Sequence, residues 1–414
     1  MPEMRDVNTS KEVIEKAESA RAKQAKFGQD ISLDSYAESA EPIEYQDDLS
    51  RLPQAAKDRM LEVGVVTDGS IKRSGTVVQM DSSVIHSLMK QDNVEVMSTN
   101  QAMKKHGWLS DYLWKAVAVD ADKYTAHVEL HHSDGYFIRS LPGSKSMYPV
   151  QACLYLNKRN LAQTVHNIII AEENSELHII TGCTSGGKNE PGLHLGVSEF
   201  YVKKGAKVSF TMIHNWDPQI AVRPRTGIIV EEGGMFISNY VIMKPVQTLQ
   251  TNPVARCLGD NAVVRFNSIL VAQQGSSLDI GSQVILDGKG SRTEIVSRAI
   301  TTGGLITARG YIEGNAPDVK GHLECRGLIL GEKGVIHAIP ELKGQIAGID
   351  LSHEAAVGKI AEEEVEYLMM RGLTRDEATA TIVRGFLRVD IEGLPEELNQ
   401  ELRHAVEASE KDIM

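Results

Sequence analysis

The chain has 414 residues, and 44 Lys and Arg against 56 Asp and Glu give it a formal charge of −12. Its 42% hydrophobic content supports a large core and excludes global disorder, while the acidic balance argues against a nucleic-acid partner. No apolar run approaches the roughly 18 residues of a membrane span, and the start MPEMRDVNTSKEV has no hydrophobic signal region. We therefore expect a cytoplasmic protein without a membrane partner.

Residues 1–75 are expected to form a helical and irregular N-terminal region. Ser10 can cap a helix over residues 10–27, which are rich in strong helix formers and end at Gly28. An acidic, mixed stretch follows, with a second helical run near Leu52–Val65. The thin apolar stripe of the first helix suggests that it lies on the surface or faces a partner.

Residues 76–348 carry short apolar runs of four to eight residues, many followed by a polar turn that contains Gly. The turn combines acidic or polar residues with Gly or Asn and leads into a β-branched run. Examples are KKGAKVSF at 203–210, EEGGMFIS at 231–238, GDNAVVRF at 259–266, QQGSSLDI at 273–280 and GEKGVIHA at 331–338. Starts roughly 15 to 30 residues apart suit the rungs of a β-solenoid. An antiparallel sandwich is also compatible with the pattern.

Residues 349–414 are expected to form a C-terminal helical domain. His353 and Glu354 open its first helix, with Ser352 as the cap, although a metal-ligand role for the pair is the alternative. Thr374 and Glu377 are spaced as the capping box of a second helix. The segment LPEELNQELRHAVEASE supplies a third. Such a tail either caps the solenoid or docks a partner.

The four cysteines are scattered and include no CxxC pair, so they form neither a disulfide framework nor a self-contained metal motif. Cys325 lies in a strand-like run, where alternation turns Glu324 to the opposite face; a buried, inert thiol is its simplest interpretation. Cys183 follows Gly182 and precedes a Gly-rich loop, which suggests an accessible and reactive thiol. Cys153 and Cys257 resemble core positions.

The segment Gly182–Asn189 nearly spells a phosphate-binding loop, but Asn189 replaces the hydroxyl residue that would hold Mg²⁺. The following NEPGLHLG cannot begin a helix, so no helix N-terminus would face a phosphate. We therefore predict no nucleotide site. Nothing resembles a nucleophile elbow or a supported carboxylate pair, so no catalytic residue is predicted.

Several motifs, in order, resemble the SufB/SufD scaffold family of iron–sulfur cluster assembly. They are LNKRNLAQTVHNIIIAEENSELHIITGCTSG, LHLGVSEFYVKKGAKVSFTMIHNW, HLECRGLILGEKGVIHAIPEL and SHEAAVGKIAEEEVEYLMMRGLTRDEATATIVRGF. The resemblance spans roughly residues 145–400. It implies a mainly β fold, in which a right-handed parallel β-helix is flanked by helical regions, and thus favours the solenoid over the sandwich.

The resemblance also implies roles for individual residues. Cys325, His353 and Glu354 match positions that hold or support a transient iron–sulfur cluster in SufB-like members, and Cys183 matches a sulfur-accepting Cys. The SufD-like branch lacks the Cys at 325, so the chain is similar to the B-type subunit. The short N-terminal region lacks the Cys-rich motif of many longer B-type members.

The resemblance implies a scaffold subunit, not an enzyme, which builds a cluster at a dimer interface. Its expected partners are an ABC-type ATPase subunit docking on residues 349–414, a second copy or a SufD-like subunit, and sulfur donor and acceptor apoproteins. Flavin is associated with some assemblies of this family, but no residue pattern here predicts it. The alternatives are a SufD-like structural partner without its own cluster and a β-helix polysaccharide-active enzyme, which predicts secretion and an aromatic-lined groove.

Overall fold

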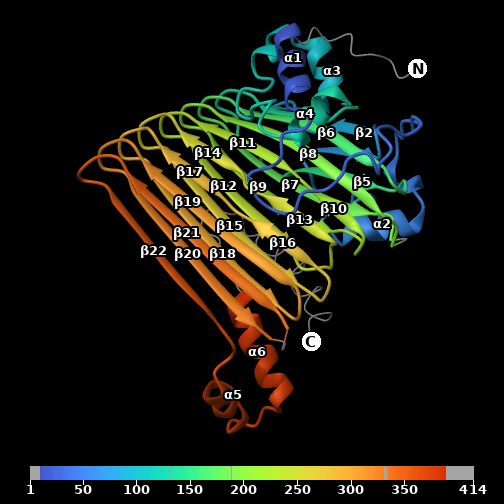
Figure 1. The fold of residues 1–414 in the computed structure, drawn as a ribbon. Coiled ribbons are helices and arrows are strands. Elements are labelled where there is room, and N and C mark those ends of the chain that lie inside the picture. The colour runs from blue at the N-terminus through green and yellow to red at the C-terminus, as the bar shows by residue number, and fades with distance from the viewer. Residues whose placement is uncertain (1–9, 132, 188, 331–332, 388–414) are drawn as a thin grey trace.

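The computed structural model describes residues 10–131, 133–187, 189–330 and 333–387. The chain winds into a β-solenoid, in which successive strands alternate between two facing sheets (Figure 1). Neighbouring strands pair in parallel along the solenoid, as β12 pairs with β9 and β15. Within the described residues, antiparallel pairs occur between β1 and β2 and between β3 and β4. The solenoid prediction is confirmed, and the sandwich is excluded.

The first sheet has 10 strands among the described residues. In spatial order they are β2 (Ser83–Met89), β1 (Gly75–Met80), β5 (Val150–Leu156), β7 (Glu176–Ser185), β9 (Lys207–Asn215), β12 (Met235–Ile242), β15 (Val263–Ala272), β18 (Arg292–Thr301), β20 (Lys320–Ile329) and β22 (Asp350–Gly358). This sheet carries Cys183 on β7 and Cys325 on β20.

The second sheet has 12 strands in the same part of the chain. Its path runs through β10 (Ile220–Val222), β13 (Thr248–Thr251), β16 (Ser277–Ile280), β19 (Leu305–Gly314), β17 (Gln283–Leu286), β14 (Val254–Cys257), β11 (Arg225–Val230), β8 (Gly192–Val202), β6 (Ala162–Ala171), β4 (Tyr136–Ser140) and β3 (Val94–Ser98), and β21 (Val335–Gly344) pairs with β19. In some turns of the solenoid this strand is interrupted and forms two short strands. Thus β13 and β14 together correspond to the length of β19, with which they align through β16 and β17.

One corner of the solenoid explains the repeated Gly or Asn of the sequence. Asn174, Gly205, Gly233 and Asn261 adopt φ of 56°, 67°, 63° and 56°. Each backbone N–H donates to the carbonyl just before the next member: Asn174 to Lys204, Gly205 to Glu232 and Gly233 to Asp260, at 2.8–2.9 Å. Gly and Asn tolerate this left-handed conformation at the least cost, so the turn dictates the residue type.

Apolar side chains of both sheets fill the interior by strict alternation. On β7 the inward side includes Leu177, Ile179 and Cys183, whereas Ile180 belongs to a separate cluster on the outer face. That outer cluster lies under residues 49–66, which include a 3₁₀ turn (Leu49–Arg51) and α2 (Gln54–Leu61). Each fully buried aliphatic side chain contributes about 1.5–3 kcal/mol, so this aromatic-poor core is sufficient.

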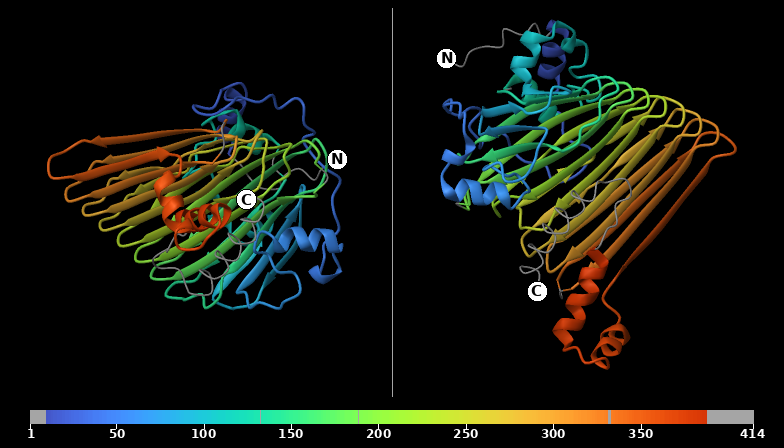
Figure 2. Two further views of the ribbon diagram at one scale, coloured as in Figure 1. Left: turned by 90° about the horizontal axis from the view of Figure 1, so that it is seen from below. Right: turned by 180° about the vertical axis from the view of Figure 1, so that it is seen from behind.

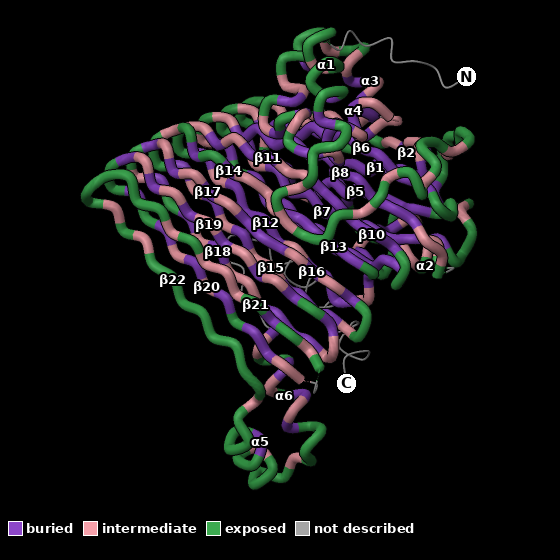
Figure 3. The backbone as a smooth tube through the Cα atoms, viewed as in Figure 1, coloured by how far each residue is buried: buried purple, intermediate pink, exposed green. Residues whose placement is uncertain are grey.

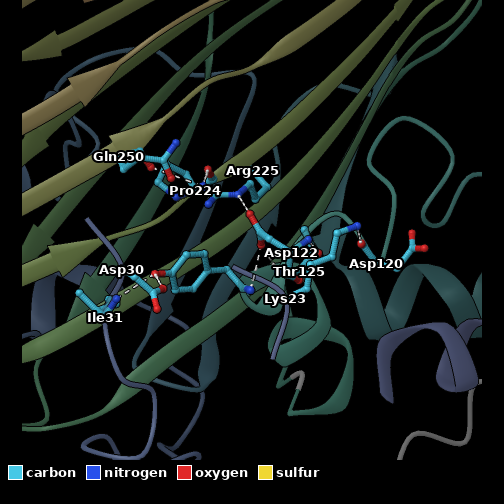
Figure 4. A network of polar contacts seen from close by, with 10 residues as sticks. Lys23, Asp30, Ile31, Asp120, Asp122, Thr125, Pro224, Arg225 and Gln250 are labelled. Carbon is cyan, nitrogen blue, oxygen red and sulfur yellow. Dashed lines mark hydrogen bonds and ion pairs between the residues drawn. The ribbon is translucent and has the colours of Figure 1, made fainter. Parts of the chain in front are cut away.

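Helical segments on both sides of residue 75 pack on the outer face of the first strands of the second sheet. They are α1 (Lys11–Ser19), α3 (Thr99–Lys105), a 3₁₀ turn (Gly107–Asp111) and α4 (Lys123–Leu130). Figure 4 shows how this region is fastened: Arg225 of β11 donates to Asp122 at 2.7 Å, and Lys23 donates to the Asp120 carbonyl at 2.7 Å. The Ser10 cap is confirmed, but the first helix ends at Ser19, because the chain then turns to reach these contacts.

The C-terminal helices are α5 (Glu362–Met369) and α6 (Arg375–Leu387), which project from the last turns of the solenoid (Figure 2). The Thr374–Glu377 capping box is confirmed, with Glu377 N–H on Thr374 Oγ1 at 3.3 Å and Thr374 N–H on Glu377 at 2.8 Å. The third predicted helix lies outside the described residues. The helix expected from residue 353 is wrong: that segment is β22, since the open edge of β20 pairs with it. The first helix of the C-terminal region thus starts at Glu362 and not near residue 349.

Candidate functional site

Cys325 lies near the middle of β20 and points into the solenoid. Its side chain is 3% exposed and belongs to the interior core. Burial, with a smaller contribution from Glu324, raises the pKa of the Cys325 thiol to about 11. The thiol is therefore neutral near pH 7 in the single chain, as the buried-cysteine interpretation predicts. Its register partners are Ser297 on β18 and Ala355 on β22.

His353 and Glu354 stand next to Cys325, but on β22 rather than on a helix. His353 is opposite Leu323 and Glu354 is opposite Glu324. Strand alternation therefore puts His353 on the face of Cys325 and Glu354 on the outer face. There the Glu354 carboxylate lies 3.8 Å from the Arg326 guanidinium.

The structure thus brings the three predicted ligands to adjacent strands without making them converge. Both β22 residues are exposed, whereas Cys325 is buried. Across the described part of the chain, no group of three or more His, Cys, Asp or Glu side chains is arranged to hold a metal ion. The predicted donors of one chain lie on two faces of one sheet.

Two of the three predicted ligands, His353 and Glu354, lie on an open edge strand, and Cys325 lies on the strand next to it. Strand β22 ends the first sheet, and its other edge pairs with no described strand. Figure 3 shows β22 exposed along nearly its whole length, and Val357 is 41% exposed. An unpaired strand edge of this kind is a template for pairing with another chain.

Cys183 contradicts the expectation of an accessible thiol. It lies within β7, not in a loop, and its side chain is 0% exposed. Burial raises the pKa of the Cys183 thiol well above its ordinary value. The adjacent Gly-rich sequence misled the prediction, because the strand runs through it as far as Ser185.

The segment that nearly spells a phosphate loop begins inside strand β7. Strand β7 continues through Cys183, and the next element is β8, which begins at Gly192, so no helix N-terminus follows. Lys188 of the motif lies outside the described residues.

A row of inward side chains connects the neighbourhood of Cys183 with Cys325. Its members share one register across the first sheet: Thr181, Met212, Tyr240, Ser268, Ser297 and Cys325. Five strand spacings separate β7 from β20, or roughly 24 Å. A cavity of about 30 Å³ is lined by Met212, Tyr240 and Ser268 of this row. The sequence did not reveal this row, because inter-strand register is not encoded locally.

The other two cysteines are structural, as predicted. Cys153 packs on the outer face of the first sheet and Cys257 in the interior, and burial raises the pKa of each thiol to about 12. All four cysteines are free thiols.

Comparison with known proteins then decides the family. Residues 154–386 match the family described as SUF system FeS cluster assembly, SufBD core domain. The chain belongs to the SufBD family. It is 50% identical over 409 residues to an iron-sulfur cluster assembly SufBD family protein of Methanothermobacter thermautotrophicus, covering 97% of this chain and 100% of the relative. An Archaeoglobus fulgidus SufBD family protein is 54% identical over 358 residues, covering 86% and 96%.

The Bacillus subtilis iron-sulfur cluster assembly protein SufB is 29% identical over 369 residues, which cover 86% of this chain and 78% of that protein. All four predicted site residues fall inside the SufBD core match. The resemblance inferred from the sequence motifs is thereby confirmed, and the chain is an iron–sulfur cluster assembly protein.

The helical tail of this SufBD protein has one packed and one open side. On α6, Val383 and Leu387 join the outer cluster of the first sheet, and Arg298 donates to the Phe386 carbonyl at 2.8 Å. On α5, Tyr367 is 51% exposed, and Met370, the residue directly after this helix, is 81% exposed. No helix in the described ranges is long and apolar enough to cross a membrane.

Proposed function

We propose that this SufBD-family chain is a SufB-like scaffold subunit on which a transient iron–sulfur cluster is built between two chains. The observation that carries the proposal is the open β22 edge beside Cys325, with His353 and Glu354 exposed on it. One Cys, one His and one Glu are too few for a cluster, which commonly has four protein ligands. A second strand paired on this edge would bring a second set of ligands within reach.

The donor chemistry suits a cluster that must be released. A Cys thiolate is a soft ligand fit for iron and sulfide, whereas imidazole and carboxylate oxygen are harder ligands. A mixed set binds a cluster less firmly than four thiolates would. The partner at the edge is proposed to be a second copy, in which case a two-fold axis relates the two sets, or a SufD-like subunit.

Cys325 must lose its proton to bind iron. With a thiol pKa near 11, iron binding displaces a proton at neutral pH, so affinity should rise with pH. Pairing at the β22 edge would also change the surroundings of the thiol. We infer that cluster binding and chain association are thermodynamically linked.

Sulfur is proposed to reach Cys325 from Cys183 along the interior row. Met212, Tyr240 and Ser268 border a cavity between the two cysteines, so part of the route is already hollow. A sulfur donor would deliver sulfur at Cys183, and acceptor apoproteins would take the finished cluster.

The tail is proposed to bind a separate ABC-type ATPase subunit. Tyr367 of α5 and Met370, directly after it, provide exposed apolar surface that the packing of α5 on α6 leaves uncovered. ATP hydrolysis is assigned to that partner, because the Gly182 segment lacks the geometry of a phosphate loop. The chain itself is a scaffold and no enzyme.

Anaerobic reconstitution with iron and sulfide tests the site. Cys325→Ala should lower bound iron and sulfide at least tenfold, and His353→Ala or Glu354→Ala should speed cluster loss to a chelator. Cys257→Ala is the matched control, since it removes a buried thiol from the same core. If Cys325→Ala and Glu354→Ala leave the cluster yield unchanged, the site assignment is wrong, and the SufD-like structural role becomes the better description.

A further inference from the structure

Two buried hydrogen-bond donors lie beside Cys183, and neither has an acceptor among the residues that the structure describes. His214 on β9 is the register partner of Cys183, so the two side chains enter the solenoid on adjacent strands. The Trp216 Nε1–H donates to His214 Nδ1 at 2.9 Å. This bond leaves the proton of the neutral ring on Nε2. The His214 Nε2 atom is buried and has no hydrogen-bond partner in the described part of the chain.

The second donor is the Tyr240 hydroxyl on β12. Its ring centroid lies 4.7 Å from that of His214. The hydroxyl oxygen is buried without a partner among the described residues, although the residue as a whole is only partly buried. Burial raises the pKa of Tyr240 well above its usual value, and the neighbouring Cys183 adds to this shift.

Both groups therefore stay protonated and neutral. Burial and the nearby His194 lower the pKa of His214 to about 3, so its ring carries no charge at neutral pH. A second phenol, Tyr136, also borders Cys183 but already contacts Thr181 Oγ1 at 3.4 Å. Orphaned donors in a dry interior cost free energy, which a bound acceptor would recover.

The neutral Cys183 thiol is a poor acceptor for them, whereas a persulfide anion on the same sulfur is a strong one. A persulfide is a stronger acid than the thiol from which it forms, and its negative charge sits one atom further from the backbone. We infer that Tyr240 and His214 form a perthiolate pocket, in which the hydroxyl and the Nε2–H donate to a persulfide anion carried by Cys183. This inference rests on the proposed sulfur-accepting role of Cys183, and Tyr240 and His214 are positioning residues for it.

The transfer balances without an external redox partner. With inorganic hydrogen disulfide as donor, Cys183–SH and HS–S⁻ give Cys183–S–S⁻ and H₂S. The donor S–S bond breaks, a new S–S bond forms at Cys183, and the thiol proton ends on the departing hydrosulfide. The negative charge moves from the donor to Cys183, where the two hydrogen bonds stabilise it.

Equilibration of the full chain with inorganic polysulfide under anaerobic conditions tests the pocket. The ratio of persulfide to thiol at Cys183 is read by alkylation, digestion and mass spectrometry. Loss of one hydrogen bond to a buried anion should lower this ratio by about 10- to 100-fold in Tyr240→Phe and in His214→Leu. His214→Gln should recover it to within about threefold, since an amide N–H also donates.

Tyr155→Phe is the matched control, because Tyr155 is 4% exposed on the outer face of the same sheet. It should leave the ratio unchanged. The pocket proposal is wrong if the persulfide-to-thiol ratio is equal in His214→Leu and His214→Gln, or if folded Tyr240→Phe keeps the wild-type ratio. Either result would still leave Cys183 as the sulfur acceptor. No persulfide at Cys183 in the wild type would instead overturn the acceptor role itself. If Tyr240→Phe fails to fold, the His214 pair alone decides.

Discussion

Cys183 is buried, so a reagent in solution can reach it only when the solenoid opens locally. We predict that this opening occurs where Arg59 of α2 crosses the ends of β7 and β9. Arg59 donates to the Ser185 carbonyl at 3.0 Å and to the Asn215 carbonyl at 3.1 Å, and it lies 3.2 Å from the Asp217 carboxylate. Ser185 is two residues beyond Cys183 in the strand. The Arg59 side chain is 21% exposed, so these contacts are partly shielded from water.

These contacts set the size of the expected change in the free energy of local opening. A hydrogen bond to a charged group contributes about 1.5–3 kcal/mol, but the freed carbonyls near the surface can regain water. We expect Arg59→Ala to lower the free energy of local opening by about 2–3 kcal/mol in total. Since 1.4 kcal/mol is tenfold, the open population should rise about 30- to 140-fold.

The assay is alkylation of Cys183 by iodoacetamide, followed by mass spectrometry of its peptide. When reclosing is fast, the alkylation rate is proportional to the open population. Arg51→Ala is the control. The Arg51 side chain is 78% exposed, and its ion pair with Asp48, at 3.8 Å, contributes little to stability. Cys325 in the same sample is an internal reference. A Cys183 rate in folded Arg59→Ala that matches Arg51→Ala would refute the reasoning.

Three further outcomes follow from the same structure. The pKa values of Cys325 (about 11) and of Cys153 and Cys257 (about 12) exceed the ordinary thiol value of 9.0, so their contribution to stability is intact below pH 9 and is lost as pH rises towards 11–12. Denaturant titrations should give a lower free energy of unfolding at pH 10 than at pH 8. The difference between the two values should be smaller in Cys153→Ala. Glu199→Gln should cost about 3 kcal/mol in the same titration, because Glu199 is 0% exposed and accepts from Trp114 N–H, Ala116 N–H and His166; Glu231→Gln, 40% exposed, should cost little. Met370→Lys should abolish calorimetric binding of the proposed ABC-type ATPase partner without lowering the melting temperature.

Local rules predicted the strands and turns but left the antiparallel sandwich open, and the family resemblance favoured the solenoid. The β-branched runs gave the strands, and the Gly or Asn turns were required because the corner needs positive φ at Gly205 and Asn261. The segment at 350–358 was mispredicted because Ala355 and Ala356 suit a helix, while the pairing that decides it lies 30 residues earlier on β20. Local propensity cannot report an open strand edge elsewhere in the chain.

The candidate site was predictable only in part, for the same reason. Cys325, His353 and Glu354 came from the family resemblance, but their division between two faces of β22 and β20 depends on register. His214 and Tyr240 carried no signal at all, since a lone His in a strand is usually a core residue. Knowing that His214 lies opposite Cys183 is what gives it a role.

The division of the ligands between two faces has a physical consequence. In the middle of a sheet, Cys325 on the inner face and Glu354 on the outer face could never share an ion, because the backbone separates them. At the edge of a sheet both faces of the last strand border whatever pairs next, so a partner strand can approach His353 on the inner face and Glu354 on the outer face, while Cys325 lies one strand further in, behind Ala355. In the proposed arrangement, the event that completes the sheet also completes the donor set. A variant that blocks edge pairing without touching a ligand, such as Val357→Pro, should therefore abolish dimer formation and cluster retention together.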